Sequence, residues 1–582
     1  MHLRSLASLV LSLNLLACGT LGSRTQARDA HAPLPWVGAV YPVGDDGEVR
    51  IDRYDGVVTL VRGGQIYAST ASADMPGQIV GVVAAMALAE EGPTLLRFGQ
   101  LGFGSGMEVA VELRGGARAV DVFERYGHVV AAAESIASTT GLTYQEGERR
   151  PVHPALRLVP PEQAVEEQFL RYDVVLSPAA TSAMADLRTL IIVERLENLV
   201  ALLSSGGIMV QHLPAADMQP ETFQRLLRTF ANVFPYMMVI GASPRSTDLF
   251  MIGSSNPLLF RPEHLYAISE TPGLADLLRN AGLTHPFDIA ARVLFASREE
   301  VMTFVQGAQP NTVRDPIAAD AIEPLPALPA PDAPEAEHQR WQEAVDEHRQ
   351  RFQRLELLRQ QMYGLDWTAG QVCPDGPSEP GCLLTDVTHD EQGADVLAEL
   401  SLSLMAAGRF VEAQLTLETA AGLGQSQVLS RAQQVLTLLL DAPPDLDERL
   451  PETLVDVRTA IVEGRCGDAL GAVEQVIGGD AERSPDDCLV AAYALVHCRG
   501  EDPEAMDQVA TLVQPLADDA AFAQRYPEVL YMVGRAAMVQ GQYQRATWSM
   551  VDYVSRSAPP QHDETQPPAA PPSTPSPDAH DS

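Results

Sequence analysis

The fold is indicated by residues 94–124, TLLRFGQLGFGSGMEVAVELRGGARAVDVFE. A short apolar run breaks into Gly102, Gly104 and Gly106, apolar residues at helical spacing follow, and a second apolar run stops at Glu124. This order predicts a strand, a glycine loop, a helix, a second strand and a terminal acid. Such a unit is typical of the first half of a nucleotide-binding parallel sheet.

The same stretch predicts a ligand site. Glycines let the backbone turn tightly and approach a ligand closely, and Glu124 can accept hydrogen bonds from both hydroxyls of a ribose. The spacing Gly102-x-Gly104-x-Gly106 differs from the pattern that holds a pyrophosphate. It resembles the loop that holds the aminoacyl end of S-adenosylmethionine in methyltransferase-like folds. A plain tight turn is the alternative.

The composition excludes several partners and chemistries. The chain has 582 residues, enough for more than one domain, and 77 acidic residues against 40 basic ones give a net charge of -37. Nucleic acid and anionic membrane surfaces would be repelled, so we expect neither as a partner. All basic residues are arginines. The absence of lysine excludes enzymes that need a phosphate-loop, Schiff-base or kinase-type lysine.

The first residues predict export and a lipid anchor. Arg4 precedes an apolar run, residues 6–16, that is too short to span a membrane. Residues 15–18, Leu-Leu-Ala-Cys, resemble the bacterial lipoprotein cleavage box. We therefore expect Cys18 to become a lipidated N-terminus that attaches the protein to a membrane of the cell envelope, on its extracytoplasmic side. A chance leader with an unmodified cysteine is the alternative.

The later elements predict a doubly wound α/β sheet of the S-adenosylmethionine-methyltransferase-like Rossmann type. A small antiparallel meander comes first, strands then alternate with helices, and two antiparallel strands come last. The expected meander is residues 49–70, the expected helices are 78–90, 126–139, 189–203 and 218–234, and the expected later strands are 157–159, 171–176, 208–212, 237–240 and 249–252.

This series resembles the spermidine and spermine synthases, a family of polyamine aminopropyltransferases. The resemblance covers about residues 41–316 and lies in the order of its segments, which are VTLVRGGQIYAST, LGFGSG, VDVFE, RYDVVLS, SSGGIMVQHLP and DLFMIGSSNPL. It implies an adenosyl ligand at Gly102, Gly104, Gly106 and Glu124.

The resemblance also implies that the reaction has been lost. The family moves an aminopropyl group from decarboxylated S-adenosylmethionine to an amine, after an acid has removed the amine's proton. Pro178 stands about where that acid is expected, and the acid expected near the adenine falls at residues 160–162, PPE. The Tyr-His-Glu-like segment reads MPGQ at residues 75–78. Of the family's acids, Glu124 alone has a convincing counterpart.

We therefore expect a non-catalytic or repurposed domain, with S-adenosylmethionine, its decarboxylated form or no cofactor at all. Adenosyl sulfonium cofactors are made in the cytoplasm, whereas the predicted lipid anchor places this domain outside it. Two alternatives stay open. The domain is an active aminopropyltransferase or another S-adenosylmethionine-dependent transferase with unrecognised acids, or it binds polyamines or other small amines.

The C-terminal part predicts helical pairs. Turns at Gly408, Gly464 and Gly541 share one design, in which a helix ends at glycine and an alanine five residues later lets the next helix approach. They resemble tetratricopeptide-type repeats, which stack helix pairs into a protein-binding surface. The spacings of 56 and 77 residues between these glycines are not one period. A generic helical bundle is therefore the alternative.

The cysteines predict two disulfides and no zinc site. Cys373 and Cys382 flank a Pro/Gly loop without the second pair or the histidines that zinc needs. Cys488 and Cys498 share one helix and lie about 15 Å apart, too far to bond. Cys466 and Cys498 lie at equivalent turns of neighbouring helical pairs, so we expect a Cys466–Cys498 bond. The alternative is that the three cysteines of the helical part are all reduced.

The expected domains cover the whole chain. They are a signal peptide (1–17), a tether (18–40), a β-meander domain (41–73), the α/β domain (74–317), a Pro/Ala linker (318–334), a charged helix (335–364), a cysteine-containing loop (365–394), helical repeats (395–557) and a disordered Pro-rich tail (558–582).

Overall fold

A computed structural model of the chain describes residues 36–41, 49–54, 57–62, 65–71, 74–124, 127–133, 136, 155–157, 171–177, 188, 190–215, 218–243, 248–318, 334–337, 339–344, 346–347, 383–384, 391–440, 450–451, 453–478 and 484–557. The predictions for the signal peptide, for Cys18, for the Cys373–Cys382 bond and for the tail fall outside these residues, as does Pro178. Within the described ranges, no helix is long and apolar enough to cross a membrane.

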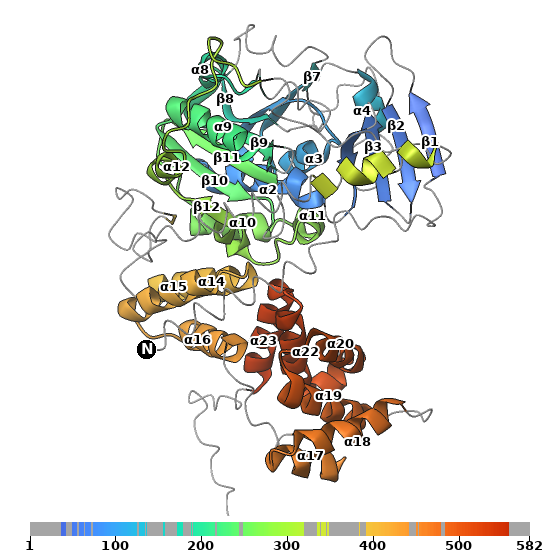
Figure 1. Cartoon of the computed structure of the whole chain (residues 1–582). Coiled ribbons are helices and arrows are strands. Elements are labelled where there is room, and N and C mark those ends of the chain that lie inside the picture. The colour runs from blue at the N-terminus through green and yellow to red at the C-terminus, as the bar shows by residue number, and fades with distance from the viewer. Residues whose placement is uncertain are drawn as a thin grey trace, which may run out of the picture. The chain divides into compact units, whose positions relative to one another are not determined.

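The chain divides into two compact units (Figure 1). The first comprises Met1–Asp441 and Ala537–Thr547, and the second comprises Ala442–Ala536 and Trp548–Ser582.

The first unit begins with a four-stranded antiparallel sheet, in which each strand pairs with the next. Its strands are β1 (Trp36–Tyr41), β2 (Val49–Tyr54), β3 (Val57–Arg62) and β4 (Gln65–Ser69). Alternating apolar residues such as Ile51 and Leu60 are fully buried, as a strand with one covered face requires. The meander starts earlier than the sequence indicated, because β1 lies in the expected tether and pairs with β2.

The second sheet has eight strands in the order β12-β10-β11-β9-β8-β5-β6-β7. Strands β5 to β9 run parallel, whereas β10, β11 and β12 are antiparallel to their neighbours. This confirms the doubly wound α/β prediction, although β12 was missed because three residues show no period. The strands are β5 (Arg97–Leu101), β6 (Ala119–Phe123), β7 (Ala155–Arg157), β8 (Tyr172–Ser177), β9 (Leu203–Pro214), β10 (Tyr236–Gly241), β11 (Asp248–Ser254) and β12 (Val293–Phe295).

Helices cover both faces of this sheet (Figure 1). The helices of this part of the chain are α2 (Met75–Leu88), α3 (Met107–Arg114), α4 (Gly127–Ala133), α8 (Val193–Val200), α9 (Pro220–Val233), α10 (Pro262–Ser269), α11 (Ala275–Asn280) and α12 (Arg298–Phe304). Helices α8, α9 and α12 share one buried apolar cluster with residues of β8, β9 and β11. Helix α2 packs on the other face, where Gly81 lies against the ring of Phe250.

The first unit also includes α14 (Glu391–Ala406), α15 (Phe410–Leu423) and α16 (Gln427–Leu440). The buried Arg409 donates hydrogen bonds to Ala291 O at 3.1 Å and to Val293 O at 2.6 Å, and so ties the α14–α15 turn to the short strand β12. Tyr266 of α10 also bonds to Glu399 of α14. The helices expected to form one repeat domain thus divide between the two units.

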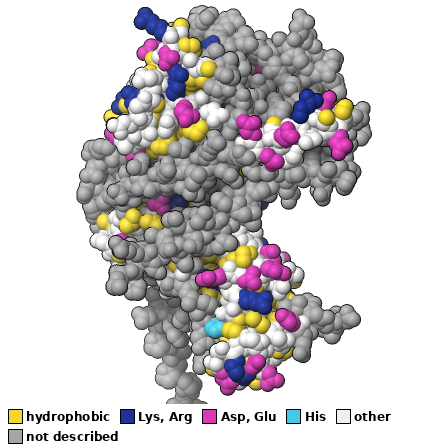
Figure 2. Space-filling model, in the orientation of Figure 1, with side chains coloured by type: hydrophobic (Ala, Val, Ile, Leu, Met, Phe, Trp, Pro, Cys, Tyr) yellow, Lys and Arg dark blue, Asp and Glu magenta, His cyan; other side chains and the backbone are white. Residues whose placement is uncertain are grey.

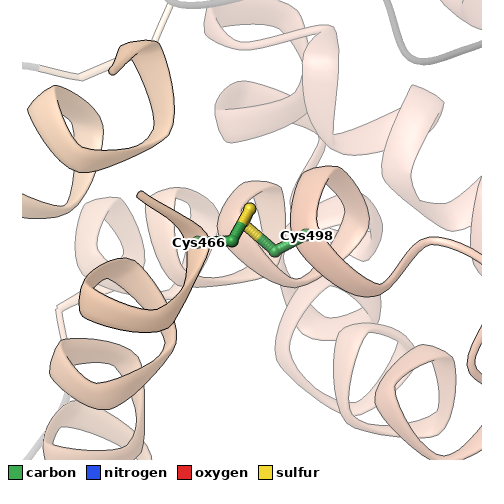
Figure 3. Close-up of a disulfide and its surroundings, with 2 residues drawn as sticks. All are labelled: Cys466 and Cys498. Atoms are coloured by element: carbon green, nitrogen blue, oxygen red, sulfur yellow. A yellow bond between two sulfur atoms is a disulfide. The ribbon is translucent and has the colours of Figure 1, made fainter. Parts of the chain in front are cut away.

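The second unit contains α17 (Val455–Val462), α18 (Cys466–Gly478), α19 (Pro485–Arg499), α20 (Pro503–Asp518) and α21 (Ala520–Arg525), with parts of α22 (Glu528–Val539) and α23 (Tyr543–Ser557). A disulfide joins Cys466 to Cys498 with their Cα atoms 5.5 Å apart (Figure 3), the pair that the sequence favoured. Cys488 lies outside the bond and is half-buried. Gly464 and Gly541 end their helices with φ values of 71° and 67°, as the turn design requires.

The acidic composition is visible on the surface. On the face drawn in Figure 2, acidic side chains of the described residues lie among arginines and small apolar groups over several elements.

Candidate functional site

The glycine loop between β5 and α3 has a backbone conformation that favours glycine. Gly102, Gly104 and Gly106 have φ values of 116°, 59° and 76°, where a side chain would be strained. The N–H of Gly102 donates to Phe123 O at 2.8 Å, and the N–H of Gly106 donates to Phe103 O at 3.0 Å. The three predicted glycines therefore occupy the positions that the turn needs, and the loop is held against the end of β6.

Glu124 follows β6 and lies beside this loop. Its Oε2 atom accepts the N–H of Phe103 at 2.8 Å, and its side chain is buried. This hydrogen bond fixes the carboxylate at the carboxyl edge of the parallel strands, where α/β sheets bind their ligands. The four predicted binding residues thus come together in the fold. That they hold a ligand stays a prediction.

A second set of hydrogen bonds ties the loop to the start of α2. The Ser105 hydroxyl donates to Gln78 Oε1 at 2.5 Å and accepts the N–H of Met107 at 3.1 Å. The Gln78 side-chain amide donates in turn to Ser69 O at 2.8 Å and to Asp74 O at 3.2 Å. Gln78 therefore bridges the meander to the glycine loop.

Two glutamates lie buried in α3, directly after the loop. Glu108 is 7% exposed and Glu112 is 0% exposed. Among the described residues, neither Glu108 Oε2 nor either carboxyl oxygen of Glu112 has a hydrogen-bond partner. Burial raises the pKa of Glu108 to about 8. Burial, and then the charge of Glu108, raise the pKa of Glu112 well above 4.5. The Glu108 carboxyl is therefore mainly uncharged at neutral pH.

Helix α3, which carries these acids, packs against the apolar helix α2. Gly115 lies on the same side of α3 as Glu112, and a Cβ atom there would be 2.9 Å from the sulfur of Met86 in α2. The sequence of α2, MPGQIVGVVAAMAL, carries no charged side chain. The amide of Gln100 in β5 is also fully buried and without a partner in the described part of the chain.

A histidine and an aspartate meet beside the first turn of α2. His212 Nε2 on β9 lies 3.6 Å from Asp248 Oδ1 on β11. This nitrogen is buried and has no hydrogen-bond partner within the described ranges. Gly77 makes room for the pair, because a Cβ atom there would be 3.2 Å from Asp248 Oδ2 and 3.8 Å from His212 Nε2. The pair lies at the end of β9 that follows its paired segment with β8, at the same edge as the glycine loop.

The sequence analysis did not predict the buried glutamates of α3 or the pair formed by His212 and Asp248. Glu108 and Glu112 did leave a signal, since two acids four residues apart interrupt one side of an apolar helix. His212 closes an apolar strand, which is also visible in the sequence. No pattern in the sequence indicated that His212 pairs with Asp248, because β9 and β11 are not consecutive strands. The described residues contain no group of three or more histidine, cysteine or acidic side chains that could hold a metal ion.

Comparison with known proteins gives a partial likeness. No family model and no curated protein matches the chain. Among solved structures, a probable spermidine synthase from Corynebacterium glutamicum is 16% identical, with a TM-score of 0.33 over 48% of this chain and 97% of its own. The spermidine synthase from Thermotoga maritima, and a spermidine synthase in complex with the transition-state analogue AdoDATO, are each 14% identical, with TM-scores of 0.32 over 42% of this chain and 88% of theirs. Because these values are low, the fold assignment rests on the strand order and register described above.

Proposed function

We propose that this chain is an extracytoplasmic lipoprotein whose α/β domain binds a ribose-bearing ligand without transferring an aminopropyl group. The observation that carries the proposal is the hydrogen bond between Glu124 and Phe103 N, which holds a carboxylate beside an intact loop of left-handed glycines. The sequence resemblance to spermidine and spermine synthases implies an adenosyl ligand at the corresponding loop and acid.

The start of α2 supports the loss of the transfer reaction. Where the resemblance leads us to expect a Tyr-His-Glu-like segment, the chain has Gly77 and Gln78, and Gln78 is engaged with Ser105 and the meander. Pro178, which lies outside the described residues, cannot accept a proton. The absence of a base at that position would slow amine attack by about 10²–10⁴-fold.

Calorimetry on the detergent-solubilised full chain tests the binding. The probes are S-adenosylhomocysteine, adenosine diphosphate and 5′-methylthioadenosine, which share the ribose. We expect at least one probe to bind. The Glu124→Gln substitution should weaken the affinity for that probe by about tenfold or more, since an amide accepts fewer ribose hydrogen bonds than a carboxylate. The matched control is Glu197→Gln, at an exposed position of α8. Binding of none of the three probes would contradict the proposal.

A second candidate function rests on His212 and Asp248. A carboxylate beside an imidazole whose Nε2 has no hydrogen-bond partner among the described residues is an arrangement that can accept a proton. The domain would then be an active transferase with a base other than the expected acid. Turnover of decarboxylated S-adenosylmethionine and putrescine by the purified chain, abolished by His212→Ala, would favour this function over ours. We expect no turnover above background in either protein.

The lipid anchor is tested separately from the ligand. If Cys18 is lipidated, Cys18→Ser leaves an unprocessed precursor or releases the protein from membranes. Membrane fractionation and the mass of the mature N-terminus report the result. An unchanged fraction together with an unchanged N-terminus would contradict the anchor and leave the binding proposal intact.

The helical part is proposed to bind a protein partner, and its exposed apolar residues support this. Val455 and Val462 of α17 are 61% and 67% exposed. A photo-crosslinking residue placed at Val455 in one variant and at Val462 in another should give a discrete adduct in cells from the full chain. The control position is Leu95, which is 52% exposed in the first unit. Absence of an adduct at both valines would count against partner binding through α17.

A further inference from the structure

A histidine lies where helix α14 packs on the α/β domain. His285 caps the short 3₁₀ helix η5 (Pro286–Asp288), which lies against α14. Its Nδ1 atom accepts the N–H of Phe287 at 3.4 Å and lies 3.1 Å from the hydroxyl of Ser403 in α14. A backbone N–H can only donate, so the neutral ring carries its proton on Nε2. The Ser403 hydroxyl then donates to Nδ1 as well.

The cap of η5 depends on this acceptor. Asp288 Oδ2 accepts the N–H groups of Thr284 and His285 at 2.7 and 2.8 Å, while the His285 ring accepts the N–H of Phe287. The two side chains thus cap the turn reciprocally. Phe287 is fully buried and Ser403 is 1% exposed, so little water can replace a lost partner. A proton on Nδ1 would set one donor against another at this buried contact.

Two carboxylates act on His285, and burial opposes them. Asp288 of its own turn and Glu399 of α14 both favour the charged imidazolium. Burial favours the neutral ring and has the larger effect, so the pKa of His285 lies below the usual value of 6.5. The ring is therefore mainly neutral at pH 7, in agreement with its role as an acceptor.

The other charged groups near this contact have partners of their own. The buried Arg292 is attracted to Asp288, and Tyr266 of α10 bonds to Glu399. Asp395 of α14 acts on Tyr266. Helix α2 carries no charged side chain, and the exposed Asp276 and Arg279 of α11 pair with each other. Protonation of His285 is therefore the change that sets the charge at this contact as the pH falls below neutral.

We propose that His285 is an acid-sensitive latch between the α/β domain and the helical pair α14–α15. A proton taken up by Nδ1 removes the acceptor for Phe287 N and Ser403, so the cap of η5 opens and the helical pair loosens. The bonds from Arg409 to Ala291 O and Val293 O do not involve the histidine, so the pair stays attached at β12. The latch lies outside the proposed ligand site.

The pH window follows from the lowered pKa of His285. Above pH 6.5 the ring is neutral in both the packed and the loosened state, so pH has no effect through it. Below pH 6.5 the loosened state, in which water reaches the ring, takes up the proton first. The equilibrium then shifts toward loosening by at most about tenfold per pH unit, until the packed ring is protonated too. At pH 5 the shift is at most about 30-fold.

Hydrogen exchange of the detergent-solubilised full chain, followed by mass spectrometry at pH 7 and pH 5, tests the latch. Natural protein and His285→Asn are compared at the same pH, so that intrinsic exchange rates cancel. Asparagine can cap the turn through its side-chain oxygen and does not titrate. From pH 7 to pH 5, the exchange rate of natural protein relative to the variant should rise by about 3–30-fold across α14 and α15. The same ratio should stay constant in α9.

Glu399→Gln separates titration of His285 from a purely structural role. Glutamine can still accept the Tyr266 hydroxyl, but it removes a charge that favours the imidazolium. The acid response of α14 and α15 should therefore continue to a lower pH in this variant than in natural protein.

An acid response of equal size in natural protein and His285→Asn would overturn the proposal. If His285→Asn does not fold, natural protein alone still decides. Acid-induced exchange confined to α14 and α15 supports the latch, whereas an even increase over α9, α14 and α15 contradicts it.

Discussion

Replacing Glu108 by glutamine should stabilise the first unit, and by more as the pH rises. Below pH 4.5 the carboxyl is protonated in both the folded and the unfolded chain, so it has no pH-dependent effect. Between pH 4.5 and about 8 the unfolded chain loses this proton and the folded chain keeps it. The free energy of unfolding therefore falls by about 1.4 kcal/mol per pH unit in this window.

The magnitude follows from the folded-state pKa of about 8. The loss of stability is below about 1 kcal/mol at pH 5, roughly 3 kcal/mol at pH 7, and levels off near 5 kcal/mol above pH 8. Glutamine has nearly the same shape as the protonated acid and is neutral at every pH. The Glu108→Gln variant should therefore recover these amounts.

The assay is hydrogen exchange in increasing urea, followed by mass spectrometry on peptides that cover α2 and α3. It measures the difference in the free energy of unfolding between natural protein and variant at the two helices beside Glu108. Natural protein and variant are compared at the same pH, so that intrinsic exchange rates cancel. Glu197→Gln at its exposed position in α8 should change nothing. A Glu108→Gln gain of the same size at pH 5 and pH 8.5, or a loss at both, would refute the assignment of a buried neutral acid.

Three further changes test hydrogen bonds within the first unit and the disulfide within the second. Asn311→Ala should lower the free energy of unfolding of the first unit by about 3 kcal/mol in urea denaturation, because the buried side-chain amide donates hydrogen bonds to Arg188 O and Ile191 O and accepts one from Ile317 N. An unchanged midpoint would contradict this. Arg409→Met removes the hydrogen bonds to Ala291 O and Val293 O and should speed hydrogen exchange across α14 and α15, with α20 as the internal control. Cys498→Ser opens a loop of 32 residues and should cost the second unit about 3–4 kcal/mol in non-reducing denaturation; equal stability would count against the bond.

The sequence was informative wherever a feature is set by neighbouring residues. The glycine loop and Glu124 were predictable because one strand–loop–helix–strand unit brings them together, and the left-handed turn needs glycine at Gly102, Gly104 and Gly106. The Cys466–Cys498 pair followed from helix length and turn position, both of which are local. Strand β12 was not predictable, since three residues show no period and its place depends on pairing with β10.

Only the tertiary structure decided which polar side chains meet near the loop and which of them are charged. His212 meets Asp248 because β11 inserts between β9 and β10, and Gly77 leaves space for both. The charge state of Glu108 depends on how completely the apolar helix α2 excludes water from α3, which no local pattern reveals. The sequence therefore determined which backbone turns and which spacings this chain can form. Only packing between distant segments decided which side chains lose water, because desolvation depends on everything that surrounds a group.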